Sequence, residues 1–117
     1  MIKKADFEQL EAQIDPYVKQ KQLKSTEAQQ HLNQYLELIL SFFKMINEVD
    51  EIDFDHLDDY PVVPMNFKER YDYIRMRKYH FMGYRQMKTM KDELIKMNAS
   101  YQIRRKREKR GEYAYVT

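Results

Sequence analysis

The chain has 117 residues, with no cysteine, two glycines, three prolines and a formal net charge of +2. This length corresponds to one domain, and the shortage of glycine and proline favours long helices. The absence of cysteine excludes disulfides and thiolate metal sites and fits a reducing cytosol. The charged, amphipathic N-terminus is unlike a signal peptide, so we expect a cytoplasmic protein with no membrane segment.

The small net charge conceals an uneven distribution along the chain. Residues 1–59 carry 6 basic and 13 acidic side chains, whereas residues 60–117 carry 15 basic and 6 acidic side chains. Such a split steers an anionic partner toward the basic half, or draws the two halves together within one fold.

The first amphipathic helix is predicted over residues 3–15, because Phe7, Leu10 and Ile14 recur at steps of three and four. Pro16 cannot continue this helix without the loss of a backbone hydrogen bond. Asp15 and Pro16 instead fit the cap and the first position of a second, short helix. A single helix with a kink at Pro16 is the alternative.

The central element of the fold is predicted to be a buried helix over residues 26–49. Its apolar residues cover nearly the whole circumference, which is typical of a helix that is buried or spans a membrane. The continuous apolar run from Leu38 to Phe43 is far shorter than the roughly 20 residues that a bilayer requires. We therefore predict a core helix that Ser25 or Thr26 caps.

An acidic segment, DEIDFDHLDDYPVVP, occupies residues 50–64. Pro61 and Pro64 prevent a continuous helix, so we predict an ordered crossover loop with one helical turn at 53–58. The segment lacks the glycine and the ligand spacing of an EF-hand. We expect a solvated acidic loop that faces the basic half, with no metal site.

Two further helices are predicted, over residues 66–77 and 79–109. Asn66 and Glu69 have the spacing of a capping box, and Phe67, Tyr71 and Ile74 share the inward face of the shorter helix. The longer helix carries a heptad-like apolar seam suited to packing on the central helix, made of Gly83, Met87, Met90, Leu94, Met97 and Tyr101.

Residues 64–99 resemble the YpoC-like family of small helical proteins from Gram-positive bacteria. The pattern R-x-x-x-I-x-x-R-x-x-H-x-x-x-Y-x-Q-[LM] carries the resemblance, together with Pro64 and Asn66; its residues are Arg70, Ile74, Arg77, His80, Tyr84, Gln86 and Met87. Lys78 stands where family members often place proline. The resemblance implies an intracellular all-helical domain associated with DNA replication or repair, with a helix break near residue 78. It supplies no catalytic residues.

No arrangement of residues in the chain indicates an enzyme. The serines lack a nucleophile-elbow context, and two glycines cannot form a phosphate-cradling loop. His31, His56 and His80 lie too far apart for a metal-binding motif, and the Glu-x-x-His pairs of di-iron bundles are absent. We therefore expect no catalytic residue, no cofactor, no metal and no small-molecule substrate.

Binding residues are expected in the basic half. Arginines interleave with aromatic residues between positions 70 and 85, an arrangement suited to phosphate contact and base stacking. The simpler interpretation is that the aromatic residues belong to the core and that the cations lie on the solvent-exposed face of the same helices. Arg70, Arg77 and His80 then tie their helices to the acidic loop. The candidate residues are Arg70, Arg77, His80, Arg85, Arg104, Arg105, Lys106, Arg107, Lys109 and Arg110.

The sequence thus predicts an all-α bundle of about four or five helices, with a central buried helix and a long C-terminal helix. Residues 1–103 form the bundle, and residues 104–117 form a basic, partly flexible tail whose cations surround any helix they form. The leading hypothesis is a non-enzymatic cytosolic interaction module that acts through its basic half on an unknown protein partner or nucleic acid. The alternative is a direct nucleic-acid-binding protein that uses the tail and the arginine- and tyrosine-rich helices.

Overall fold

The computed structural model describes residues 1–109, and the predicted all-α bundle is confirmed. One short 3-10 turn, η1, lies in the connection between the second and third helices. The elements are α1 (Lys4–Lys19), α2 (Thr26–Asn47), η1 (Leu57–Asp59), α3 (Phe67–Met76) and α4 (Phe81–Lys109). Among the described residues, no helix has the length and apolar character needed to cross a membrane.

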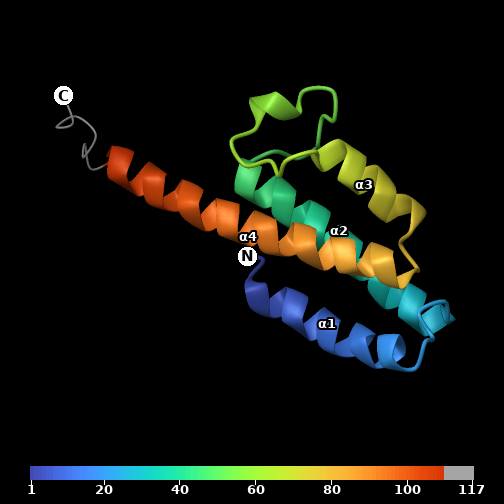
Figure 1. Cartoon of the computed structure of the whole chain (residues 1–117). Helices are drawn as coiled ribbons and strands as arrows, with labels where there is room; N and C mark the ends of the chain where they lie inside the picture. Colours follow the sequence, from blue (N-terminus) through green and yellow to red (C-terminus); the bar gives the residue numbers. More distant parts are fainter. Residues whose placement is uncertain (110–117) are drawn as a thin grey trace.

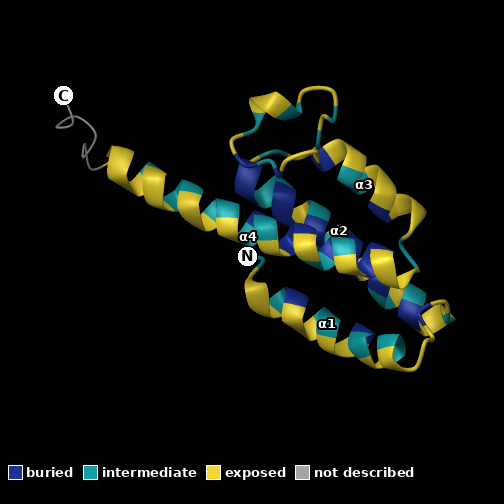
Figure 2. Ribbon diagram, in the orientation of Figure 1, coloured by how far each residue is buried: buried dark blue, intermediate teal, exposed yellow. Residues whose placement is uncertain are grey.

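Helix α2 is the core element, as predicted. Helix α4 crosses in front of α2 in Figure 1, and α2 contacts both α1 and α4. Leu32, Tyr35 and Phe43 on α2 are completely buried. The Ser25 hydroxyl caps the helix by accepting a hydrogen bond from the Ala28 N–H at 3.3 Å. Figure 2 shows that the buried positions of all four helices lie where the helices face one another.

Helix α1 runs through Pro16 without interruption, so the predicted break before this residue is wrong. Because Pro16 has no backbone N–H, the Ala12 carbonyl lacks its usual helical hydrogen bond. Both residues are exposed, so water can satisfy that carbonyl. Tyr17 and Val18, beyond the proline, pack against the core and anchor the final turn.

The α2–α3 connection is attached to the bundle by Asn47, the last residue of α2. Its side-chain amide donates to the carbonyls of Phe43 and Val62, and its side-chain oxygen accepts from the Val62 N–H. These three distances lie between 2.9 and 3.0 Å. Because Asn47 and Val62 are both buried, water cannot replace this pairing without opening the loop.

We expect Asn47→Ala to lower the free energy of unfolding by about 2 to 3 kcal/mol, because it leaves buried backbone groups of Val62 unpaired. Urea denaturation measures this difference. Gln30→Ala, at an exposed position of the same helix, should stay within about 0.5 kcal/mol of the parent. Equal stability of the two variants would contradict the attachment through Asn47.

Helix α3 begins after Asn66, but the predicted capping box is absent. Asn66 has a left-handed backbone with φ of 55°, and its side chain makes no cap hydrogen bond. A capping side chain ordinarily needs an extended backbone at this position, which explains the difference. The inward face is as predicted: Phe67 and Ile74 are buried, and Tyr71 packs against the core.

Helices α3 and α4 form a hairpin whose turn spans residues 77–80, so the predicted break near residue 78 is confirmed. Gly83 permits this close packing: a Cβ atom there would lie 1.8 Å from the Arg77 carbonyl oxygen. The seam of α4 also lies as predicted. Gly83, Met87, Met90 and Leu94 are buried, while Met97 and Tyr101 pack partly against the core.

Candidate functional site

The structure separates the predicted binding residues into two groups at different ends of α4. Arg70, Arg77, His80 and Arg85 belong to the α3–α4 hairpin, whereas Arg104, Arg105, Lys106, Arg107 and Lys109 lie on the last turns of α4. A rise of 1.5 Å per residue puts Arg85 about 29 Å from Arg104 along the helix axis. One small ligand therefore cannot contact both groups. Arg110 lies outside the described residues.

Arg70 has a structural role between α3 and α4. Its guanidinium donates to both carboxylate oxygens of Glu93, at 2.7 and 3.1 Å, and to the Met65 carbonyl at 3.2 Å. A bidentate arginine–carboxylate pair of this kind fixes geometry as well as charge. The interpretation of Arg70 as a tie to the acidic loop is wrong, since its carboxylate partner lies on α4.

The remaining candidate residues of the hairpin face outward. Arg77, His80 and Arg85 are exposed, and the Arg77 guanidinium lies 5.8 Å from the centroid of the Tyr73 ring. The Arg77 carbonyl accepts a hydrogen bond from the His80 N–H at 2.9 Å, which closes the turn. Among residues 1–109, neither Arg77 nor His80 forms an ion pair with the acidic loop, contrary to the structural alternative.

The last turns of α4 extend away from the other helices (Figures 1 and 2). We call this segment the α4 basic end; its cations are Arg104, Arg105, Lys106, Arg107 and Lys109. All are exposed except Arg105, which is partly buried and lies 3.6 Å from a Glu48 carboxylate oxygen. Successive residues differ by about 100° around a helix, so positive charge surrounds the segment.

One aromatic ring lies among these cations. The guanidinium carbons of Arg104 and Arg105 lie 6.0 and 5.6 Å from the centroid of Tyr101. Tyr101 is also the last seam residue that packs against the core. The α4 basic end therefore joins the bundle at an arginine–tyrosine cluster.

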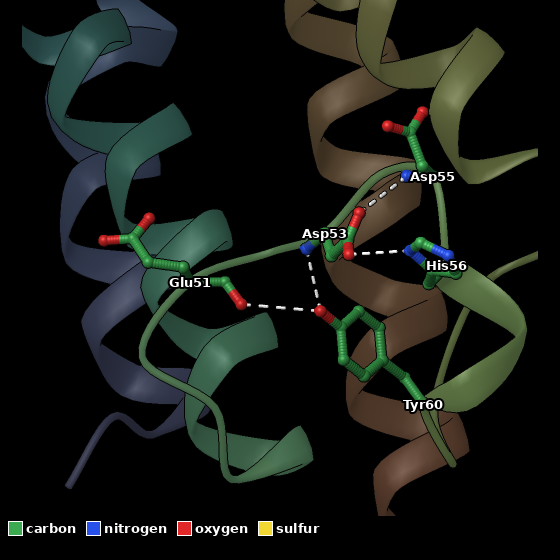
Figure 3. Close-up of polar contacts among 5 residues, drawn as sticks. All are labelled: Glu51, Asp53, Asp55, His56 and Tyr60. Carbon is green, nitrogen blue, oxygen red and sulfur yellow. Dashed lines mark hydrogen bonds and ion pairs between the residues drawn. The ribbon is translucent and has the colours of Figure 1, made fainter.

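The acidic loop packs its apolar residues against the core and also has polar contacts within itself. Figure 3 shows the Asp53 carboxylate between the Asp55 N–H, at 3.0 Å, and the His56 ring, at 2.7 Å. The Tyr60 hydroxyl accepts from the Asp53 N–H at 2.7 Å. The hydrogen bond to Asp53 raises the pKa of His56, and the same contact lowers the pKa of Asp53.

The loop provides no grouping of three or more histidine, aspartate or glutamate side chains suited to a metal ion, and neither does the rest of the described chain. Its helical turn, Leu57–Asp59, is shorter than predicted and begins later than residue 53. Its carboxylates are largely exposed, and Glu48, which precedes the loop, forms an ion pair with Arg105 of the α4 basic end.

A buried polar network between α1, α2 and α4 was not predicted. The Lys91 ammonium lies 2.8 Å from carboxylate oxygens of both Glu11 and Asp92, and the Tyr35 hydroxyl donates to Glu11. Only 6% of the Lys91 side chain is exposed. A neighbouring hydrogen bond runs from the Tyr84 hydroxyl to Asp15 at 2.8 Å.

The electrostatics of this network favour a structural role. Burial acts to lower the pKa of Lys91, but hydrogen bonds to Asp92 and Glu11 outweigh it and raise the pKa. Burial and a carboxylate hydrogen bond raise the pKa of Tyr35 and of Tyr84. A lysine held protonated and tyrosines held neutral are poorly suited to act as nucleophiles or bases at neutral pH.

The sequence contains a signal for this network, namely charged residues at inward positions of two helices. Lys91 lies four residues after Met87 and three before Leu94, which places it on the buried face of α4. Glu11 lies four residues after Phe7 and three before Ile14 on α1. Charged residues at inward positions require buried partners, but spacing alone does not say which partners.

The fold defines a small all-α helical-bundle protein. The chain belongs to the YpoC-like protein family, whose model matches residues 2–106. This match is wider than the resemblance over residues 64–99, and covers all four helices except the last residues of α4. Comparison with curated proteins and with solved structures gives no significant match.

Proposed function

We propose that this protein is a non-enzymatic cytosolic interaction module that binds an anionic partner through the α4 basic end. The observation that carries the proposal is the projection of this segment beyond the bundle. The exposed cations Arg104, Lys106 and Lys109 contribute little to packing and can contact an approaching negative surface. The family resemblance suggests a setting in DNA replication or repair.

Direct nucleic-acid binding is the second candidate, and the Tyr101 cluster favours it. A tyrosine ring flanked by Arg104 and Arg105 offers a stacking surface beside phosphate-binding cations. An acidic protein partner also binds the cations, but it gains less from the tyrosine ring because it has no bases to stack on it.

Neutralising the α4 basic end tests the proposal. The triple variant Arg104→Gln/Lys106→Gln/Lys109→Gln should lose most capture of partners from native extract, since exposed cations are removed without touching the core. Its melting temperature should match the parent. The control Lys4→Gln/Lys19→Gln/Lys68→Gln removes equal charge from exposed positions elsewhere. Equal losses in both variants would show that net charge alone controls capture.

Nuclease treatment and salt titration separate the two candidates. Capture that survives nuclease supports a protein partner, and capture that disappears supports nucleic acid. For duplex DNA, log affinity should fall linearly with log salt concentration. If all three substituted cations contact phosphates, the α4 variant should reduce the magnitude of that slope by up to about 2.7.

A further inference from the structure

A second candidate binding surface lies at the end of the bundle remote from the α4 basic end. The α1–α2 turn and the α3–α4 turn lie side by side there and line an open pocket of about 490 Å³, which we call the turn pocket. Figure 1 shows both turns at the same end of the molecule. The lining residues are Val18, Lys21, Leu23, Lys24, Tyr79, His80 and Phe81. This volume lies within the range of known ligand sites.

The walls of the turn pocket are apolar and fixed. Leu23 is buried, while Val18 and Tyr79 are partly buried against the core. The Tyr79 hydroxyl donates to the Asn33 side-chain oxygen at 3.0 Å, which holds the ring in place. Phe81 is 49% exposed at the first residue of α4, so the pocket offers an aromatic ring to a ligand.

The rim of the turn pocket is cationic. Lys21 and Lys24 are exposed, and among residues 1–109 neither forms an ion pair. Two carboxylates on α1 and α2 bond to tyrosines, since Glu27 accepts from the Tyr17 hydroxyl and Asp15 accepts from the Tyr84 hydroxyl. Neither carboxylate forms an ion pair with a rim lysine. The rim charge is therefore available to an anionic ligand.

Lys21 also occupies a strained position. Its φ is 56°, and the Gln22 N–H bonds back to the Tyr17 carbonyl at 2.8 Å, a helix-ending turn that usually contains glycine here. A side chain with a β-carbon is disfavoured in the left-handed region. The chain thus keeps a cation on the pocket rim at a cost in stability, and strain of this kind is common at binding sites.

We propose that the turn pocket binds a short acidic peptide segment of a partner protein. The peptide carries a large apolar side chain, which enters the pocket, with carboxylates on either side of it in the peptide sequence. The apolar walls fit the inserted side chain, and Lys21 and Lys24 fit the flanking acids. An acidic segment is favoured over a neutral one by the unpaired rim charge. This inference does not depend on the α4 basic end, which lies at the other end of the bundle.

Fluorescence anisotropy tests the proposal on the full chain, with a labelled hexapeptide that has two glutamates on each side of a Leu-Phe pair. We expect saturable binding, at least tenfold weaker for Lys24→Glu and within twofold of the parent for the control Lys4→Glu. The α4 triple variant should bind the peptide like the parent. A peptide with glutamines in place of the glutamates, and one with serines in place of Leu-Phe, should each bind at least tenfold more weakly.

Lys21→Gly provides a test that separates binding from folding. Relief of strain should raise the melting temperature by about 2 to 5 °C, while peptide affinity falls at least threefold. Glu48→Gly relieves the same strain at the end of α2, where φ is 57°, and should leave peptide affinity unchanged. Unaltered binding in Lys24→Glu, loss of binding in the α4 triple variant, or no saturable binding by the parent would each overturn the proposal.

Discussion

Gly83→Ala is expected to destabilise the protein by about 3 kcal/mol or more, because α3 and α4 can no longer pack as they do. An added Cβ would lie 1.8 Å from the carbonyl oxygen of Arg77 and 2.4 Å from its carbonyl carbon. These are backbone atoms, and the same carbonyl accepts the His80 N–H that closes the turn. No side-chain rotation relieves the clash, so the hairpin must open.

Urea denaturation measures the loss, and Ser100→Ala serves as the control. Ser100 is an exposed position in α4, where alanine should change stability by no more than about 0.5 kcal/mol. If Gly83→Ala unfolds at the same urea concentration as the parent, the close approach of α4 to the end of α3 is wrong.

Lys91→Met should destabilise the protein by about 3 to 5 kcal/mol, the cost of leaving a buried charge without its partner. The substitution removes the cation 2.8 Å from Glu11 while it keeps a side chain of similar length. Glu11 retains the hydrogen bond from Tyr35 but loses its counter-charge. Thermal or urea unfolding measures the effect.

The double variant Lys91→Met/Glu11→Gln distinguishes an unpaired charge from simple loss of packing. Glutamine keeps an acceptor for the Tyr35 hydroxyl and removes the isolated charge, so much of the stability should return. A double variant less stable than Lys91→Met would mean that the ion pair is not the reason for the destabilisation.

The helices were predictable because their apolar residues recur at helical spacing. The central helix and the seam from Gly83 to Leu94 follow from that periodicity alone. The break at Pro16 was wrongly predicted because packing of the following turn outweighs one missing hydrogen bond. The capping box at Asn66 was wrongly predicted because spacing does not reveal a left-handed backbone.

The candidate site was only partly readable from the sequence. The run of cations near the end of the chain is visible in the sequence, but the projection of α4 away from the bundle is a tertiary property. The partner of Arg70 is Glu93, 23 residues away, and several nearer acidic residues were equally plausible by charge. The turn pocket was not predicted, because residues near position 20 and position 80 form it together.

The central claim is that the protein binds its partner through the α4 basic end. Its most direct test is partner capture from native extract by a chain truncated after Ile103, compared with the full chain. We predict that the truncated chain melts at nearly the same temperature and loses most of the captured material. Undiminished capture by the folded, truncated chain would contradict the claim and move the binding surface to the hairpin residues Arg77, His80 and Arg85.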